Sequence, residues 1–252
     1  NLNNIWKDME QYLKKGKKVL FSGTPCQVAQ VKNLFKRYKE QLYTIDIVCH
    51  GTPPEQIFVD YIKMIEKKEK GNVCEFKFRD KKQGWGKYGS VTFEKKGYKK
   101  RINLPEWNSS YYSFFMEGNL QRENCFHCPY AESRRCSDLT LGDYWGVEKY
   151  QPQILKSNDG IFDEFKGISA ILVNTKRGKE LLEGINAILI PAEVESIVLG
   201  NSQLRHPVPK GKLYIQVKEA YKKRGYRAVE QIFRIQKTRG KIKRLINLLR
   251  VK

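Results

Sequence analysis

The chain has 252 residues, of which 40% are hydrophobic, and a formal net charge of +21 at pH 7. This length and composition suffice for one sizeable core or two small ones, which excludes an intrinsically disordered chain. No apolar run approaches the roughly 20 residues of a membrane-spanning helix, and the first residues lack the basic start and apolar middle of a signal peptide. The sequence therefore predicts a cytoplasmic protein.

The first seventy residues alternate between helical and strand-like patterns. Helices are expected over residues 3–15, 25–38 and 53–68, and strands over 17–23 and 42–49. Strands that alternate with helices of this length favour crossover connections and a largely parallel sheet.

The middle of the chain changes character. Three short strand-like runs, "VCEFKFRD", "YGSVTFEKKG" and "YKKRINL", are separated by turns rich in Gly and Lys, which predicts an antiparallel hairpin insertion at about 72–104. An aromatic helix over 109–120 and a cysteine-bearing loop follow. The last third is expected to hold a strand over 168–174, a helix over 176–187, a strand over 187–194 and basic helices.

The predicted fold class is therefore α/β, with a mixed, largely parallel sheet, flanking helices, the antiparallel insertion and C-terminal basic helices. We expect a catalytic domain over residues 1–212 and a basic helical tail over 213–252.

The tail carries a large share of the positive charge. Residues 218–252 contain thirteen Lys or Arg and two Glu, and apolar residues recur at helical spacing at Ile242, Leu245, Ile246 and Leu249. Such a helix either packs one stripe on the body of the protein or docks on an anionic surface, such as the inner face of the membrane. Nucleic acid is not expected as a partner, because the basic residues are not interleaved with a stacking platform and no nucleic-acid-binding motif is present.

A short motif occurs twice, as "SGTPC" ending at Cys26 and as "CHGTPP" beginning at Cys49. Each copy follows a predicted strand and precedes a predicted helix, with Thr as the expected N-cap and Pro as the expected first helical residue. In a parallel sheet the carboxyl ends of the strands lie at one edge, where ligands bind. We therefore expect Cys26 and Cys49 to face one crevice.

The six cysteines indicate metal or redox chemistry rather than disulfides, since the chain carries no secretion signal. The pair Cys125-x-x-Cys128 has the spacing of two thiolates that clamp one metal centre. Three explanations remain open. They are a zinc site from Cys125, Cys128, Cys136 and His127; a 4Fe-4S cluster on Cys26, Cys49, Cys125 and Cys128; and simple burial of Cys26 and Cys49. The cluster explains Cys26 better than zinc does, because a helix N-terminus lowers a thiol pKa and offers N–H groups to an anionic cluster.

Four motifs in order carry a family resemblance: "GTPCQV", "DIVCHGTPP", "FRDKKQGWGKYGSVTF" and "CFHCPYAESRRCSDLTLGDYWG". From about Lys17 to Gly146, and more weakly to about Lys212, the chain resembles the bacterial branch of the coenzyme F(420) hydrogenase/dehydrogenase beta subunit family. The resemblance implies an iron-sulfur flavoprotein that holds a 4Fe-4S cluster and FAD and passes electrons between them and a substrate. The deazaflavin substrate of the archaeal relatives is not transferred.

The resemblance also implies roles for individual residues. It assigns cluster ligation to Cys26, Cys49, Cys125 and Cys128, whereas Cys136 is left out and Cys74 is expected to be a core thiol in a strand. The predicted cofactor-binding residues are Gly23, Thr24, Arg79, Lys81 and Trp85, with further positive charge from Lys82 and Lys87. For Asp138 and Asp143 we expect hydrogen bonds to backbone or cofactor, or a role in forming turns.

The expected function is an oxidoreductase that passes electrons between the cluster and FAD to an unidentified acceptor, within a cell-surface polysaccharide pathway. The expected electron donor is a ferredoxin, or an N-terminal ferredoxin-like module outside this sequence, in which case the chain is a fragment. The alternative is a non-enzymatic scaffold, stabilised by zinc or a cluster, that docks a membrane or a glycosyltransferase complex. Hydrolase chemistry is not supported, because Ser22 lies outside a GxSxG motif.

Overall fold

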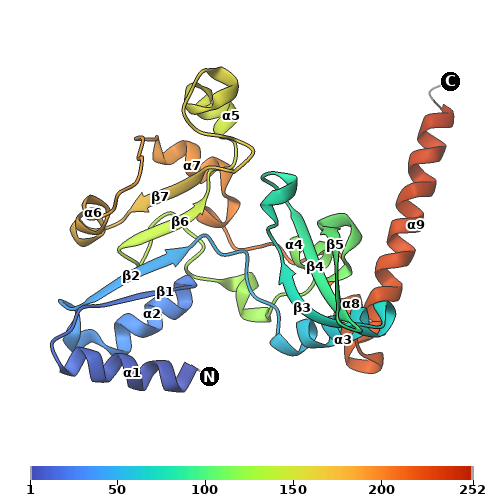
Figure 1. Cartoon of the computed structure of the whole chain (residues 1–252), viewed down its shortest axis with the longest axis horizontal. Coiled ribbons are helices and arrows are strands. Elements are labelled where there is room, and N and C mark those ends of the chain that lie inside the picture. The colour runs from blue at the N-terminus through green and yellow to red at the C-terminus, as the bar shows by residue number, and fades with distance from the viewer. Residues whose placement is uncertain (1, 251–252) are drawn as a thin grey trace. The chain divides into compact units, whose positions relative to one another are not determined.

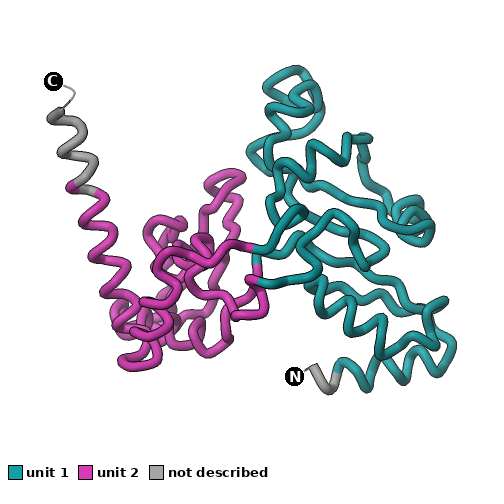
Figure 2. The backbone as a smooth tube through the Cα atoms, turned by 180° about the vertical axis from the view of Figure 1, so that it is seen from behind, with its two compact units in different colours: residues 1–50, 127–207 teal, residues 51–126, 208–252 magenta. Residues whose placement is uncertain are grey.

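The computed structural model describes residues 2–250, without the side chains of residues 2–4, 241 and 243–250. The chain divides into two compact units, each assembled from two separate stretches (Figure 2). Unit 1 comprises residues 1–50 and 127–207, and unit 2 comprises residues 51–126 and 208–252. The sequence-based division at residue 212 stays a prediction.

Unit 1 is built on a four-stranded sheet with the order β1-β2-β6-β7 (Figure 1). Its strands are β1 (Val19–Gly23), β2 (Leu42–Ile47), β6 (Leu139–Asp143) and β7 (Ser169–Val173). The pairs β1–β2 and β2–β6 are parallel, and β7 runs antiparallel to β6. The predicted mixed, largely parallel sheet is thereby confirmed.

The helices of unit 1 surround this sheet. They are α1 (Leu2–Lys14), α2 (Pro25–Leu34), α5 (Val147–Tyr150), α6 (Lys176–Glu183) and α7 (Val194–Gly200). One apolar cluster joins Met9 and Leu13 of α1 to Val31 of α2 and Leu42 of β2. The apolar stripes of α1 and α2 therefore pack together over the first parallel strand pair.

Unit 2 holds a three-stranded antiparallel sheet and four helices. The strands are β3 (Asn72–Lys77), β4 (Tyr88–Lys95) and β5 (Tyr98–Pro105), and the helices are α3 (Glu55–Glu69), α4 (Ser110–Met116), α8 (Tyr214–Arg224) and α9 (Tyr226–Arg250). These elements confirm the antiparallel insertion and the C-terminal helices. Short 3₁₀ turns in the two units span Lys36–Tyr38, Lys81–Gln83, Glu106–Asn108, Glu123–His127, Pro152–Ile154, Lys156–Asn158 and Ser202–Leu204.

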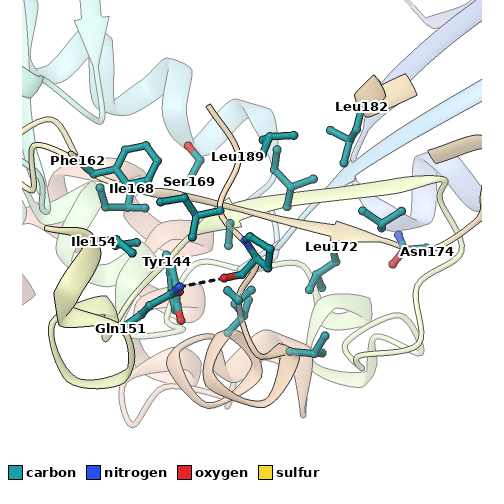
Figure 3. A pocket seen from close by; sticks show the side chains of 18 of the residues that line it. Tyr144, Gln151, Ile154, Phe162, Ile168, Ser169, Leu172, Asn174, Leu182 and Leu189 are labelled. Atoms are coloured by element: carbon teal, nitrogen blue, oxygen red, sulfur yellow. Dashed lines mark hydrogen bonds between the residues drawn. The ribbon is translucent and has the colours of Figure 1, made fainter. Parts of the chain in front are cut away.

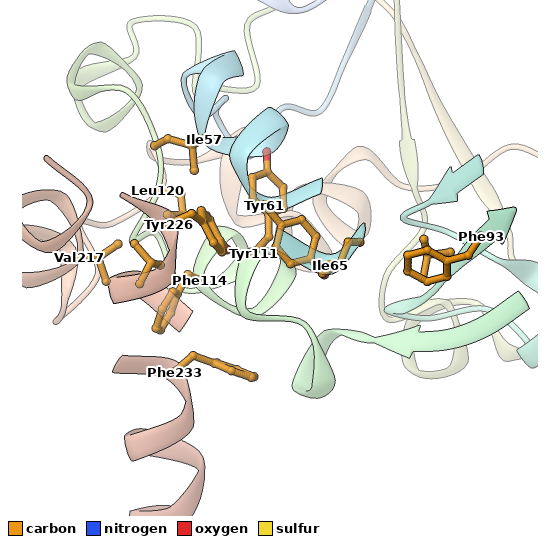
Figure 4. Close-up of a cluster of buried hydrophobic side chains, with 12 residues drawn as sticks. Ile57, Tyr61, Ile65, Phe93, Tyr111, Phe114, Leu120, Val217, Tyr226 and Phe233 are labelled. Carbon is orange, nitrogen blue, oxygen red and sulfur yellow. The ribbon is translucent and has the colours of Figure 1, made fainter. Parts of the chain in front are cut away.

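An aromatic core joins the helices of unit 2 to its sheet (Figure 4). Tyr61 of α3 stacks on Tyr111 of α4 with ring centroids 5.5 Å apart, and Phe114 meets Phe233 of α9 edge to face at 5.8 Å. The Tyr61 hydroxyl lies 2.9 Å from the Ser109 hydroxyl, so this buried polar group has a partner. Burial raises the pKa of Tyr61, which keeps the phenol neutral.

Two sequence-based predictions of local structure were wrong, and proline explains both. Thr52 is not an N-cap: α3 begins at Glu55 with Pro54 as its cap residue, because Pro54 disfavours a helical conformation at Pro53. The strand expected over 187–194 is absent from this part of the described chain, where Pro191 lacks the N–H that a central strand would donate and Ile188 is 70% exposed.

Two further features concern the chain's helices. The helix expected over 176–187 ends at Glu183. Of the four apolar residues expected to form a stripe on the tail, Ile242 is 51% exposed, and Leu245, Ile246 and Leu249 fall outside the described side chains. Among the described residues, every helix is too short or too polar to span a bilayer.

Truncation of Phe114 tests the unit 2 core. Because Phe114 is fully buried, Phe114→Ala is expected to lower the free energy of unfolding by about 3–5 kcal/mol, as measured by urea denaturation. Tyr98→Ala is the matched control, since Tyr98 is 80% exposed and its loss is expected to change stability by less than about 0.5 kcal/mol. Equal effects of the two substitutions would contradict this core.

Candidate functional site

The first cysteine motif lies where β1 ends and α2 begins. Thr24 is the N-cap of α2 and Pro25 its first residue, as predicted. The Thr24 backbone N–H donates to Gln27 Oε1 at 2.9 Å, and the Thr24 hydroxyl lies 3.2 Å from the exposed Cys26 sulfur. Cys26 therefore occupies the first turn of a helix, where backbone N–H groups lack intrahelical partners.

The second motif follows the neighbouring strand. Gly23 at the end of β1 pairs in register with Asp46 of β2, so the carboxyl ends of both strands reach the same edge of the sheet. Cys49 lies two residues after the end of β2 and is half-buried. The expected placement of Cys26 and Cys49 after adjacent parallel strand ends is thus present in unit 1.

Cys136 is tied to the same helix turn. Its sulfur donates to the Pro25 carbonyl at 3.5 Å, and Lys32 of α2 donates to the Cys136 carbonyl at 2.7 Å. Burial, with a smaller contribution from Asp46, raises the pKa of the Cys136 thiol. A cysteine that the family resemblance left aside therefore packs against the first turn of α2.

A buried ion pair attaches the cysteine loop to β2. The Arg135 guanidinium lies 3.1 Å from the Asp46 carboxylate, and the two side chains are 2% and 0% exposed. The same guanidinium donates to the carbonyls of Tyr130 at 2.6 Å and Ile47 at 3.2 Å. The loop that follows Cys128 is therefore anchored to the strand end that precedes Cys49.

A second carboxylate of unit 1 bonds to the sheet itself. Asp138 accepts hydrogen bonds from the backbone N–H and the hydroxyl of Thr44, both at 2.8 Å, and from the Thr175 hydroxyl at 2.7 Å. The expected bond between Asp138 and the backbone is therefore present. Sequence reasoning missed the roles of Asp46 and Arg135. Asp46 shares the buried face of β2 with Leu42 and Thr44, and this polar face gave no sequence signal that it is buried.

Cys125 contacts the second motif within unit 2. The Thr52 backbone N–H donates to the Cys125 sulfur at 3.4 Å. Gly51 has φ +85°, and a Cβ at that position would lie 2.8 Å from Gln121 Cγ and 3.0 Å from Cys125 Cβ. Only glycine combines this backbone conformation with so close an approach, so the turn after Cys49 is shaped to fit the Cys125 segment.

The loop predicted to lie beside the flavin is closed by its own contacts. Arg79 donates to the Gly86 carbonyl at 2.6 Å, and the buried Asp80 accepts from Ser90 and from Arg101, with which it forms an ion pair. Lys87 pairs with Glu106 at 3.2 Å. The loop that carries Lys81 and Trp85 is therefore held in shape by residues that sequence reasoning did not single out, Asp80 above all.

The predicted site residues are divided between the two units. Gly23, Thr24, Cys26, Cys49 and Cys128 belong to unit 1, and Arg79, Lys81, Trp85 and Cys125 belong to unit 2. Among the described side chains, no three His, Cys, Asp or Glu residues lie close enough to hold a metal ion. The donor chemistry of the predicted ligands, four thiols, is that of iron-sulfur and zinc centres.

Cys74 lies on β3, as expected for a strand residue, but its thiol is exposed and not in the core, and it donates to the Thr92 carbonyl at 3.4 Å. The expectation of a core thiol was wrong, because Val73 and Phe76 are the residues of β3 that pack against the core and Cys74 does not.

Unit 1 also holds an open cavity of about 640 Å³, lined by β7 and by the irregular segment after α6 (Figure 3). Its lining is mostly apolar, with Phe162, Ile168, Leu172 and Leu189 among the residues. Gln151 donates to the Pro191 carbonyl at 2.9 Å across this region. The cavity therefore has a mostly apolar lining and the size of a small-molecule site.

Parallel strands that end in cysteine-bearing turns, followed by a CxxC loop, define an α/β protein with the thiol chemistry of redox and metal-binding proteins. The family model for the C terminus of the coenzyme F420 hydrogenase/dehydrogenase beta subunit matches residues 16–195, and the chain belongs to this family. It is therefore a redox-related subunit of the hydrogenase and dehydrogenase type.

The anchoring role of Arg135 gives a testable consequence. Arg135→Met leaves the Asp46 carboxylate buried without its ion-pair partner and is expected to lower the free energy of unfolding by about 3–5 kcal/mol. The neighbouring Arg134 is exposed, so Arg134→Met is the matched control. Urea denaturation measures stability, and the alkylation rate of Cys128 measures release of the loop.

The double variant Asp46→Leu/Arg135→Met separates the effect of an unpaired buried charge from the effect of changed side-chain packing. It removes both charges and is expected to recover part of the stability lost in Arg135→Met, because no unpaired charge remains buried. Equal stability of Arg134→Met and Arg135→Met would show that the ion pair does not anchor the loop.

Proposed function

We propose that this chain is an iron-sulfur flavoprotein oxidoreductase subunit, in which Cys26, Cys49, Cys125 and Cys128 hold a 4Fe-4S cluster and a loop of unit 2 contacts FAD. The parallel pairing of β1 and β2, which ends two neighbouring strands in cysteine-bearing turns, is the observation that carries the proposal. The cluster supplies single electrons and the flavin supplies two-electron chemistry when they are bound.

The environment of the thiols supports a negatively charged centre. Cys26 lies in the first turn of α2, where the helix dipole stabilises anionic charge. Cys125 accepts a hydrogen bond from the Thr52 backbone, and such N–H···S bonds stabilise thiolates and tune the reduction potential of a cluster. These residues would hold the ligands in place and reduce the repulsion between thiolates.

The flavin part of the proposal is supported by the loop between β3 and β4. Arg79, Lys81 and Lys82 give it positive charge, and Trp85 offers an aromatic face. Positive charge near a flavin stabilises its anionic reduced form and the pyrophosphate of FAD. The buried Asp80–Arg101 ion pair would hold this loop in shape while its basic residues meet the cofactor.

We further propose that the electron donor is a ferredoxin or a ferredoxin-like module, and that the acceptor belongs to a cell-surface polysaccharide pathway. The alternative proposal, a non-enzymatic scaffold with zinc or a cluster, shares the thiol ligands but needs neither iron reduction nor flavin. The two proposals are therefore separated by the metal and the colour of the protein.

Iron content tests the ligand assignment. Anaerobically purified protein is expected to hold about four irons per chain and to show a broad visible absorbance that dithionite bleaches. Cys26→Ser is expected to lower the iron content to below about half, because a cluster with three thiolates is readily lost. Cys74→Ser is the matched control and is expected to keep the full content, since its exposed thiol lies on the edge strand β3.

A colourless, zinc-loaded protein would favour the scaffold and contradict the cluster. Full iron content in Cys26→Ser, together with loss of iron in Cys136→Ser, would show that Cys136 and not Cys26 is a ligand. Cys136 is the next candidate because its sulfur contacts the Pro25 carbonyl in the first turn of α2.

Flavin retention tests the loop. Denaturation of the purified protein is expected to release FAD, identified by its absorbance and by chromatography. Lys81→Gln and Trp85→Leu are expected to weaken FAD binding by about tenfold or more, because each removes a charge or a stacking face. Lys99→Gln, at an exposed position of β5, is the control. Unchanged FAD content in both loop variants would show that the flavin binds elsewhere.

A further inference from the structure

A second cavity, which none of the predicted cofactor residues lines, lies within unit 2. It has a volume of about 380 Å³, is open on one side, and is lined by α3, by the segment from Asn119 to Glu123, and by α8 and α9. This size falls at the lower end of the roughly 300–1,000 Å³ range of small-molecule sites. We call it the α8 pocket and define it by its lining residues Pro54, Ile57, Asn119, Leu120, Gln121, Arg122, Glu123, Tyr214, Val217, Lys218, Tyr221, Lys222 and Val229.

The floor of the α8 pocket is apolar. It is formed by Ile57 of α3, Val217 of α8 and Leu120, which are labelled in Figure 4, and by Val229 of α9. All four are between 0% and 9% exposed and belong to the unit 2 core. These side chains come from four separate elements and are fixed by core packing. The floor therefore offers a preformed surface for an apolar body. The two buried polar residues of the lining, Asn119 and Gln121, already spend side-chain hydrogen bonds within unit 2.

Two tyrosines form part of the wall, and their hydroxyls already have partners. The Tyr214 hydroxyl donates to Glu123 Oε2 at 2.8 Å, and the Tyr221 hydroxyl donates to Asp60 Oδ2 at 2.8 Å. These bonds commit the hydroxyls to carboxylates. The Tyr214 ring is itself buried, with Phe126 edge to face at 4.8 Å and the ammonium groups of Lys210 and Lys218 at 5.1 and 5.4 Å from its centroid. The Tyr221 ring is therefore the one that adds apolar contact surface to the wall.

The mouth of the pocket is positively charged. Tyr214, Lys218 and Lys222 are spaced by four residues on α8 and share one helix face, and Arg122 lines the pocket from the chain segment opposite. Glu123 is the only acid among the lining residues. Its carboxylate is shared by Lys210 and Lys218, the second at 3.8 Å, so the basic residues outnumber the acidic ones at this mouth.

We propose that the α8 pocket binds a single-chain amphiphile with an anionic head, its apolar chain on the floor and its head at Lys218, Lys222 and Arg122. Charge complementarity selects the sign of the head, and the apolar floor selects the chain. The proposal is independent of the cluster and of FAD, because it uses other residues. It assigns to unit 2 a lipid-like ligand and not a nucleotide, whose polar body would lose its hydration on this floor.

The test measures binding of ten-carbon probes to the whole purified chain by titration calorimetry, below the micelle concentration of each probe. Decanoate and decyl phosphate are expected to bind with one site per chain, whereas decyltrimethylammonium is not. The ratio of the dissociation constants of decanoate and decyl phosphate shows whether the site prefers a carboxylate head or a phosphate head. Shortening the carboxylate to octanoate is expected to weaken binding by roughly tenfold, about threefold to fourfold for each methylene removed.

Substitutions at the mouth test the charge without touching the core. Lys218→Gln/Lys222→Gln is expected to weaken decanoate binding about tenfold or more, because charge-assisted hydrogen bonds to the head are lost. Lys223→Gln is the matched control, since Lys223 is exposed on the same helix but does not line the pocket. All three positions are exposed lysines, so these variants are expected to unfold at the temperature of the parent chain.

Three outcomes would overturn the proposal. They are no binding of decanoate or decyl phosphate, equal binding of the cationic probe, and a loss in Lys223→Gln as large as in the double variant. The last outcome would mean that the probes respond to the general positive charge of the helix and not to the pocket.

Discussion

The buried ion pair between Asp46 and Arg135 is the constraint on which the arrangement of unit 1 depends. A carboxylate inside a sheet is tolerated only when a cation and hydrogen-bond donors compensate its charge. Asp46 meets this condition with Arg135 and with the Thr140 hydroxyl at 2.6 Å. Arg135 also donates to three backbone carbonyls, two of them in its own loop and one at the end of β2. The charge of Asp46 therefore fixes the path of a loop that is distant from it in sequence.

This constraint shows why some features of the site were accessible from the sequence and others were not. Regular sequence patterns were sufficient to predict the parallel pair β1–β2 and the start of α2. In α2, Thr24 and Pro25 have the residue types typical of an N-cap and a first helical residue. The partner of Asp46 was not accessible, because side chains far apart in sequence leave no local pattern. An acid in a strand reads as a solvent-facing residue until its neighbours in space are known.

Proline shows the same limit at the level of backbone conformation. The two threonine motifs look alike, yet the helix after "GTPP" begins only at Glu55, because the second proline disfavours a helical conformation at the first.

The division of the chain into units is a further feature that the sequence does not reveal. The chain leaves unit 1 after residue 50 and returns at residue 127 without any change in composition that would mark the boundary. Contacts in space, and not composition, define the units.

The positive charge of the chain takes on a more specific meaning in unit 2. Counted along the sequence, the basic C-terminal helices suggest only a general attraction to anionic surfaces. In the structure, part of this charge is neutralised locally, as where Lys210 and Lys218 share Glu123. Another part lies beside an apolar pocket that core packing holds open. A charge beside an apolar surface selects ligands more narrowly than a charge in open solvent does. A ligand must then carry both an opposite charge and an apolar part. The chemistry that unit 2 recognises therefore depends on where α8 places its lysines, and not on how many the chain contains.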